Sequence, residues 1–338
     1  MTSNRAWYRQ PSFWIGLLIS ALSLFLLSLL VNVPDLIEKL KQTDLHFVII
    51  GLLVTCVSAC LRAIRWASLL GPGIGFWNVF HAENIGNMLN SVLPLRAGDP
   101  ARAYILSRAK NGRGIPALEA LSTIVLIRLV DVFAVGILLG LVIPALEVPE
   151  IVKAGGYSIL AVALLAFVVL VIGAFARQWL LRLIAAILTR FLSKNLADRL
   201  LAWIDSFLIG LSALRNVRSL LSLVGTTTLL WISYVAFYVL ILRAFSPTPV
   251  LAWAALAACA ASFSLAVPSS PGAIGVFHAA VAFVMAPYLT ADTATAYAIV
   301  VHATEIASIL TFGAYSLAAT GSSIQRVTAQ ITRQPDAG

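Results

Sequence analysis

The chain contains the stretch Glu83-Asn-Ile-Gly-Asn-Met-Leu-Asn-Ser-Val-Leu-Pro-Leu-Arg-Ala-Gly-Asp-Pro-Ala-Arg102, which places amides, prolines, arginines and an aspartate within or beside an apolar segment. A second interrupted stretch, Ser264-Leu-Ala-Val-Pro-Ser-Ser-Pro-Gly-Ala-Ile-Gly-Val-Phe-His278, lies in the other half of the chain. Polar groups at bilayer depth are costly and mark functional sites by default. Two apolar segments broken by proline and glycine at corresponding places are typical of a transporter site built from half-helices.

The composition around these stretches is that of an integral membrane protein. Hydrophobic residues make up 60% of the 338 residues and charged residues only 11%, whereas soluble domains carry about 25% charged residues. We therefore predict an all-α polytopic bundle with six full spans and two broken, re-entrant or paired elements. The predicted spans are Phe13–Val33, Leu45–Leu61, Leu121–Ile143, Tyr157–Ala176, Ser219–Leu242 and Ala294–Ala319.

The placement of the charges predicts the orientation in the membrane. Because cytoplasmic loops are enriched in Lys and Arg, the basic clusters indicate the inner face of the cell's inner (plasma) membrane, with both termini in the cytoplasm. The net charge of +9 follows this topology and does not indicate nucleic-acid binding. The basic clusters are Arg5/Arg9, Arg62/Arg65, Arg96–Arg113, Arg177–Arg218 and Arg326/Arg333.

The order of spans predicts two membrane repeats of opposite orientation. Pro94 precedes Arg128 by 34 residues, and Pro268 precedes His302 by the same number. Such matched positions favour an inverted-topology repeat over coincidence. The predicted repeats are 1–156, with its broken element at 76–102, and 157–338, with a cytoplasmic amphipathic segment at 177–218 and its broken element at 250–291.

Asn84, Asn87 and Ser91 recur at three- to four-residue spacing, with Glu83 and Asn90 alongside, on one side of a predicted helix. Amides facing lipid would remain unpaired at a cost of several kcal/mol each, as an order of magnitude. This side must therefore face protein or a wet cavity. Two interpretations remain open, a polar seam between helices and a surface that lines a substrate path.

Both breaks also contain residue types that are typical of the first positions of a helix. Asp99-Pro100 reads as an N-cap followed by proline at the first helical position, and Ser270-Pro271 repeats the pattern with Gly272 and Gly275 after it. Helix N-termini attract anions. Arg96 and Arg102 beside the first start add charge, and a guanidinium binds two phosphate oxygens at once. We therefore predict an anionic, phosphate-bearing ligand.

Two further pairs lie near the start of a span. Arg128 and Asp131 are one turn apart and can neutralise each other, either as a structural clamp or as a link between the two breaks. His302 and Glu305 have the same spacing, and His278 could join them. Histidine titrates near neutral pH, so these histidines are either proton carriers or packing residues.

Three quoted motifs resemble one known family. Asn87–Arg102 resembles the signature N-x-x-x-x-x-x-P-x-R-x-G-D-x-x-R of the lysylphosphatidylglycerol synthase transmembrane-region family, also described as flippase-like. Ile127–Asp131 is similar to its E-R-x-x-D span, and the segment from Pro268 to His278 is similar to its P-x-x-P-G-G-x-G-x-x-E segment. The resemblance covers nearly the whole chain. It implies a polytopic inner-membrane protein that handles lipids, as its relatives do in flipping aminoacylated phosphatidylglycerol or in polyprenyl-phosphate sugar and hopanoid pathways.

The chain departs from the family pattern at three positions. Ile127 and His278 stand where glutamates are usual, and Ala273 replaces the second glycine. The loss of two acids weighs against a cationic aminoacyl-lipid headgroup. The soluble synthase domain of the bifunctional relatives is also absent from this sequence, so the resemblance implies no aminoacyl transfer.

These observations predict a flippase-like transporter that moves an anionic lipid or a lipid-linked intermediate, with no catalytic residue, metal or cofactor assigned and the oligomeric state open. The alternatives are a membrane glycosyl- or phospho-transferase acting on a polyprenyl phosphate, and a non-catalytic partner of a lipid synthase. The predicted substrate-binding residues are Asn84, Asn87, Asn90, Arg96, Asp99, Arg102, Arg128, Asp131, Ser270, Gly272, Gly275 and His278.

Overall fold

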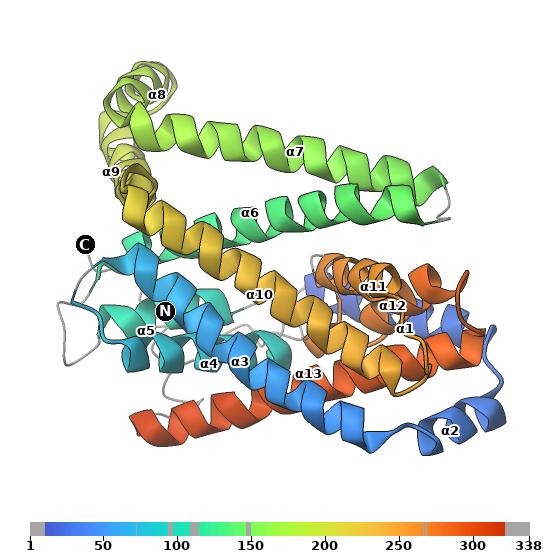
Figure 1. The fold of residues 1–338 in the computed structure, drawn as a ribbon. Coiled ribbons are helices and arrows are strands. Elements are labelled where there is room, and N and C mark those ends of the chain that lie inside the picture. Colours follow the sequence, from blue (N-terminus) through green and yellow to red (C-terminus); the bar gives the residue numbers. More distant parts are fainter. Residues whose placement is uncertain are drawn as a thin grey trace.

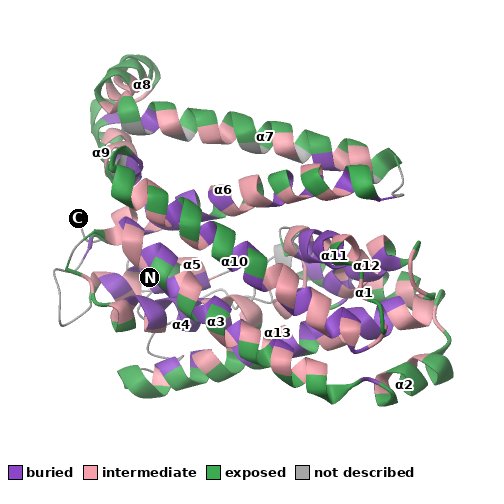
Figure 2. Cartoon of the chain, viewed as in Figure 1, coloured by how far each residue is buried: buried purple, intermediate pink, exposed green. Residues whose placement is uncertain are grey.

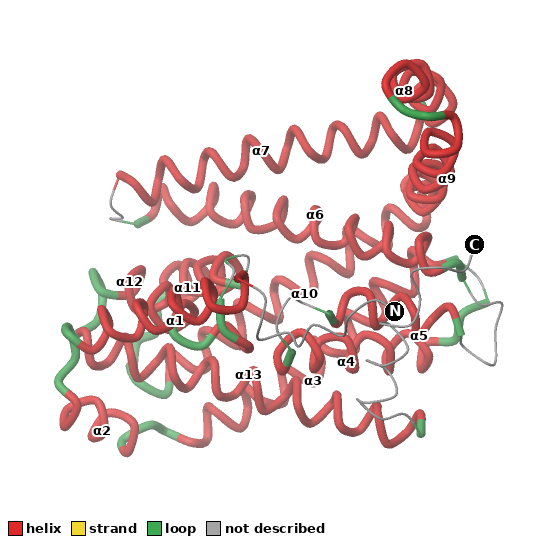
Figure 3. The backbone as a smooth tube through the Cα atoms, turned by 180° about the vertical axis from the view of Figure 1, so that it is seen from behind, coloured by secondary structure: helices red, strands yellow, loops and turns green. Residues whose placement is uncertain are grey.

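Long apolar helices form most of the molecule, which a computed structural model describes over residues 11–71, 73–93, 97–108, 115–146, 150–265, 267 and 269–321. Within these residues the chain is helical and contains no strand (Figure 3). Five helices there are long and apolar enough to cross a bilayer. They measure about 39–45 Å, because an α-helix rises 1.5 Å per residue, and so exceed the roughly 30 Å of hydrocarbon. The five are α3 (Leu45–Leu70), α6 (Ala117–Val142), α7 (Glu150–Phe175), α10 (Val217–Arg243) and α13 (Ala291–Thr320). The prediction of an all-α polytopic membrane protein is confirmed.

The predicted first span, Phe13–Val33, is wrong as a single straight helix. The chain forms α1 (Pro11–Ser28) and α2 (Val33–Lys41), which are bent by 92° relative to each other. Pro34 lies in the first turn of α2, where its fixed φ suits a helix start and its missing N–H does no harm. The apolar run therefore continues past the point at which the helix ends.

Both interrupted stretches break the helical path. The first forms α4 (Phe76–Val92) and α5 (Gly98–Ser107), and the second forms α11 (Leu251–Ser264), the short turn η5 (Pro271–Ala273) and α12 (Val276–Met285). The two lie towards opposite ends of the long helices (Figure 1). They meet where η5 packs against α4, with a Cβ built on Gly272 only 3.5 Å from the carbonyl oxygen of Ser91.

The long helices divide into an inner group and an outer pair. α3 packs along α10, and α13 packs against α4 and α12. α7 packs along the far side of α6 and is largely exposed (Figures 1 and 2). From α7 the chain passes through α8 (Arg177–Phe191), α9 (Lys194–Gly210) and the turn η4 (Leu211–Arg215) to α10, while the turn η3 (Ile143–Ala145) ends α6. The predicted boundary between the repeats, at residues 156 and 157, lies inside α7, and the inverted repeat stays a prediction.

Candidate functional site

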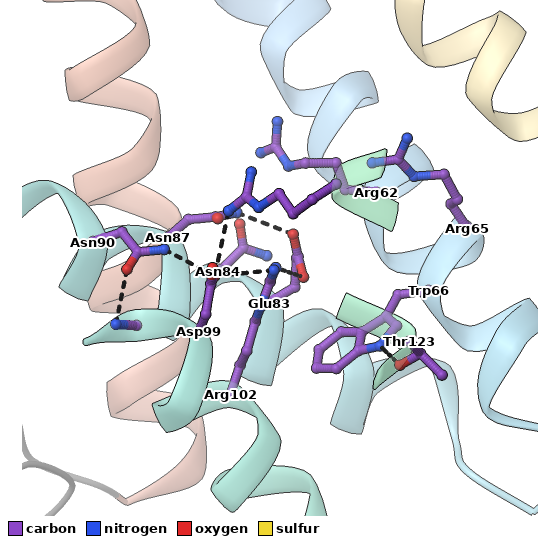
Figure 4. A network of polar contacts seen from close by, with 12 residues as sticks. Arg62, Arg65, Trp66, Glu83, Asn84, Asn87, Asn90, Asp99, Arg102 and Thr123 are labelled. Carbon is purple, nitrogen blue, oxygen red and sulfur yellow. Dashed lines mark hydrogen bonds and ion pairs between the residues drawn. The ribbon is translucent and has the colours of Figure 1, made fainter. Parts of the chain in front are cut away.

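Four arginines and three carboxylates from α3, α4, α5 and α6 lie close together, with Arg128 at the exposed edge, and we call them the ion cluster. Figure 4 shows its members on α3, α4 and α5. Charged groups are rare within membrane helices and face the protein interior or a cavity. The ion cluster comprises Arg62, Arg65, Glu83, Asp99, Arg102, Arg128 and Asp131.

The first interrupted element is held together by backbone contact between α4 and α5. A Cβ on Gly86 would lie 2.9 Å from the carbonyl oxygen of Gly98, and a Cβ on Gly98 would collide with the carbonyl oxygen of Gly86. The Asn90 side chain of α4 accepts a hydrogen bond from the Gly98 N–H at 2.8 Å and donates one to Asp99 at 3.1 Å. The predicted N-cap at Asp99 is wrong, because Ala97 occupies the N-cap position and Asp99 lies within the first turn of the helix. α5 begins at Gly98, and the Asp99 carboxylate is available to arginines.

Arg102 is the most enclosed member of the ion cluster, with a side chain only 2% exposed. Its guanidinium lies 2.5 Å from Glu83 Oε2 and 3.0 Å from Asp99 Oδ1. It also lies over the Trp66 ring, 5.3 Å from the centroid, and the Trp66 indole donates to Thr123 at 2.9 Å. Arg102 thus connects α3, α4 and α5, as a planar and permanently charged group is suited to do.

The expected pairing of Arg128 with Asp131 is wrong. Asp131 instead receives both ends of the Arg65 guanidinium, at 2.5 and 3.0 Å, which joins α6 to α3. Arg128 reaches Asp99 at 3.3 Å, which joins α6 to α5. Two opposing effects act on the pKa of Asp99, which lies outside the five spanning helices. Burial raises its pKa, but the Arg102 and Arg128 guanidiniums outweigh burial and hold the pKa below its ordinary value.

Arg62 differs from the other three arginines. Its Nη1 donates to the Tyr234 hydroxyl at 3.3 Å. Its buried Nε has no hydrogen-bond partner, a property that it shares with the Nε atoms of Arg65 and Arg102. Glu83 and Glu305 lie near enough to interact with Arg62 electrostatically. Among the described residues no carboxylate forms an ion pair with Arg62. The predicted end of the second span at Leu61 is wrong, because α3 continues to Leu70. Arg65 is buried and Arg62 is half-buried, so both contact protein.

The amides predicted on one side of α4 mostly bond within their own helix. Asn84 is 2% exposed and donates to the Phe80 carbonyl. Asn87 donates to Glu83 at 3.3 Å. They hold α4 and the Glu83 carboxylate in place, which favours the polar-seam interpretation for Asn84. Arg96, predicted as a phosphate ligand, and Pro268 lie outside the described residues.

The second interrupted element carries serine, glycine and histidine, and no ion pair forms within it among the described residues. Ser270 begins η5, and Gly272 and Gly275 have φ of 69° and 91°, values that favour glycine. The Gly275 N–H donates to His278 Nδ1 at 3.3 Å, and His278 Nε2 lies 3.2 Å from His302 Nδ1. Because His278 Nδ1 accepts, a neutral His278 carries its proton on Nε2 and donates it to His302. The two histidines therefore hold α12 to α13.

Two further polar residues, Ser20 of α1 and Glu305 of α13, lie around the second interrupted element. The Ser270 N–H donates to the Ser20 hydroxyl of α1 at 2.9 Å. Glu305, one turn after His302 on α13, hydrogen-bonds to Tyr238 of α10. The pair predicted on α13 therefore contacts two different elements, as Arg128 and Asp131 do on α6.

Comparison with known proteins supports the family resemblance that the three motifs indicate. A family model described as the lysylphosphatidylglycerol synthase TM region matches residues 13–313. The chain belongs to this family. The resemblance drawn from the motifs is thus confirmed, and the protein is a multi-pass membrane protein.

Two curated proteins illustrate what this family member resembles. The glycosyltransferase AglD of Haloferax volcanii is 25% identical over 91% of this chain and 54% of its own length. The UPF0104 membrane protein of Methanocaldococcus jannaschii is 30% identical over 35% of each chain. The chain thus spans about half the length of the first relative. No solved structure matches it.

Proposed function

We propose that this protein binds an anionic, phosphate-bearing lipid or lipid-linked intermediate at the ion cluster and moves it across the inner membrane. The observation that supports this most is the guanidinium of Arg62 on a spanning helix, which donates to the Tyr234 hydroxyl but has no ion-pair partner among the described residues. A cation at bilayer depth costs about 2.5–3.5 kcal/mol or more. A bound phosphate would form the ion pair that Arg62 lacks and could accept a hydrogen bond from its free Nε.

The charges of the ion cluster support an anion as the ligand. The ion cluster contains four guanidiniums and three carboxylates, and a fourth carboxylate, Glu305, interacts electrostatically with Arg62. Each carboxylate is already held by an arginine, so a cationic headgroup would have to displace one. The existing ion pairs therefore favour phosphate over an aminoacyl cation, in line with the glutamates that this chain lacks at Ile127 and His278.

The interrupted elements provide a means of movement. α4–α5 and α11–α12 lie towards opposite ends of the bundle and meet at Ser91 and Gly272. Short helices that join at non-helical residues can shift against long ones by changing few torsions. A lipid headgroup at the ion cluster would pass along this contact, with the hydrocarbon remaining in the bilayer. We further propose that both chain termini are cytoplasmic, as the basic clusters predict.

A second candidate follows from AglD, whose name is that of a glycosyltransferase and which aligns with 91% of this chain. In that case the chain would bind a lipid-phosphate-linked sugar as part of a transfer reaction. The same arginines would hold the phosphate. The two candidates differ in whether a new glycosidic bond is formed.

Reconstituted vesicles test the proposal. A fluorescent phosphatidylglycerol is added to both leaflets, and a membrane-impermeant quencher then reports how fast the inner pool reaches the outer leaflet. We expect rapid exchange with the wild type and near-background exchange with Arg62→Gln. Arg243→Gln, which removes the same charge from an arginine over Phe47, should behave as the wild type. Equal exchange in the wild type and in empty vesicles, together with sugar transfer in detergent, would replace the transporter by the enzyme.

A further inference from the structure

The helices α8 and α9 carry exposed apolar side chains along one side of each helix. On α8 they recur every four residues and are 44–76% exposed, and residues four apart lie on the same side of a helix. The other sides pack inwards, α8 against α9 and α9 against α6. A continuous exposed apolar surface marks a place where a protein contacts a partner or a membrane. We call this surface the α8–α9 stripe, and it comprises Trp179, Leu183, Ile187 and Phe191 of α8 with Leu196 and Trp203 of α9.

Exposed basic residues border the α8–α9 stripe. At 3.6 residues per turn, Arg182 lies about 60° around α8 from Trp179, and Arg199 lies about 40° around α9 from Trp203. Neither arginine forms an ion pair with a described residue, and Arg182 Nε donates only to the Gln178 carbonyl oxygen of its own helix. The described part of α8 and α9 has four exposed basic residues against one exposed acid; they are Arg182, Arg190, Lys194 and Arg199, with Asp198. The surface is therefore apolar with a positive edge.

Both helices run across the ends of α6 and α7 and not along them (Figures 1 and 3). They have 15 and 17 residues, about 23 and 26 Å at 1.5 Å per residue, which is less than the roughly 30 Å of hydrocarbon. One apolar cluster joins Leu208 of α9 to Leu69 at the end of α3, Val79 at the start of α4 and Ala120 at the start of α6. The pair α8–α9 thus lies at one end of the spanning helices, crosswise to them.

Exposed aromatic side chains on two other elements lie at the same end of the bundle. Trp77 in the first turn of α4 and Tyr315 near the end of α13 are each more than half exposed. His81 stacks on Trp77 and hydrogen-bonds to Ser316, the neighbour of Tyr315, which brings the two aromatic residues together. Tryptophan and tyrosine concentrate where a membrane meets water. The headgroup layer of one leaflet is therefore expected at the level of the α8–α9 stripe.

We propose that the α8–α9 stripe lies in this headgroup layer and binds anionic phospholipids, with Arg182 and Arg199 on their phosphates. Amphipathic helices with an apolar face and basic residues lie in the interface plane and favour anionic lipids, and a guanidinium binds two phosphate oxygens at once. A second copy of the chain on the stripe would bring the same positive edge against itself, and like charges repel. The site goes beyond the proposed function, because it lies on the surface of the bundle and requires no movement of lipid.

Depth-dependent quenching tests the placement of the stripe. In a chain without native cysteines, a fluorophore is attached at Ile187→Cys of the stripe or at Asp198→Cys, which is exposed and about 140° around α9 from Trp203. The protein is reconstituted in nanodiscs of phosphatidylcholine and phosphatidylglycerol. A nitroxide on the upper part of a lipid acyl chain should quench the probe at residue 187, and aqueous iodide should quench the probe at residue 198. Iodide quenching at residue 187, or quenching there by neither agent, which would show that protein covers the stripe, overturns the proposal.

The same probe at residue 187 tests the preference for anionic lipid. The nitroxide is carried either by phosphatidylglycerol or by phosphatidylcholine at the same mole fraction, and phosphatidylglycerol should quench more strongly. Arg182→Gln/Arg199→Gln should lose this difference. Arg243→Gln, at the far end of α10, should keep it. Equal quenching by the two lipids in the unmutated stripe, or a preference that survives in the double variant, would overturn the assignment of the phosphates to these arginines.

Discussion

The Arg65–Asp131 pair offers the sharpest test of how the ion cluster is built. The Arg65 side chain is 4% exposed and that of Asp131 25%, and two N–O contacts of 2.5 and 3.0 Å join them. Asp131→Asn keeps the shape but leaves a buried guanidinium without its anion. Breaking a buried pair in this way costs about 3–5 kcal/mol. At about 2 °C per kcal/mol for a large chain, the melting temperature should fall by about 6–10 °C.

The assay is thermal unfolding in detergent, followed by the fluorescence of a thiol-reactive dye that reacts with the buried Cys259 when the bundle opens. Asp198→Asn, at an exposed aspartate of α9, is the control and should leave the melting temperature unchanged. The double variant Arg65→Met/Asp131→Leu should recover most of the loss, because apolar replacement of both partners is often neutral. A wild-type melting temperature for Asp131→Asn would refute the pairing. Destabilisation of the double variant as great as that of the single one would refute the charge argument.

Three further predictions concern the interrupted elements and the topology. Asn90→Ala removes the acceptor of the Gly98 N–H and should lower the free energy of unfolding by about 0.5–2 kcal/mol. This loss would be seen as a lower melting temperature. An unchanged melting temperature would show that the hydrogen bond from Gly98 to Asn90 does not hold α5. Gly275→Ala should destabilise the protein by about 1–3 kcal/mol, because the φ of Gly275 is 91° and a Cβ there would lie 2.5 Å from the Ser20 carbonyl oxygen. A wild-type melting temperature for this variant would contradict the close contact with α1. In a chain without native cysteines, an impermeant maleimide applied outside should label Asp35→Cys and not Arg108→Cys, and the reverse pattern would invert the orientation.

The sequence was sufficient to predict much of the fold for a clear physical reason. Long apolar runs have few stable states in a bilayer other than spanning helices, so five of the six predicted spans correspond to long helices. The two breaks were visible because proline and glycine are local signals. The bend between α1 and α2 was missed, since the apolar run masked the turn before Pro34.

The partners within the site could not be predicted in the same way. Spacing along one helix suggested Arg128 with Asp131, whereas the structure pairs each with a residue on another helix. Arg62 and Arg65 were taken for topology signals because basic residues near the end of an apolar run look alike whether they face water or protein. Their three-residue spacing on one helix face was the only sequence signal of a shared role. The pairing itself depends on how α3, α4, α5 and α6 pack.

The central claim is that Arg62 binds the phosphate of a lipid. Mass spectrometry of lipids that co-purify with the protein tests this claim most directly. The wild type, Arg62→Gln and Arg243→Gln are purified from the same membranes in a mild detergent, and the bound lipids are quantified per protein. We expect a phosphate-bearing anionic lipid, enriched over its share of the membrane, on the wild type and on Arg243→Gln, and its loss from Arg62→Gln. Equal retention of that lipid by Arg62→Gln, or enrichment of an uncharged or cationic lipid on the wild type, would contradict the claim.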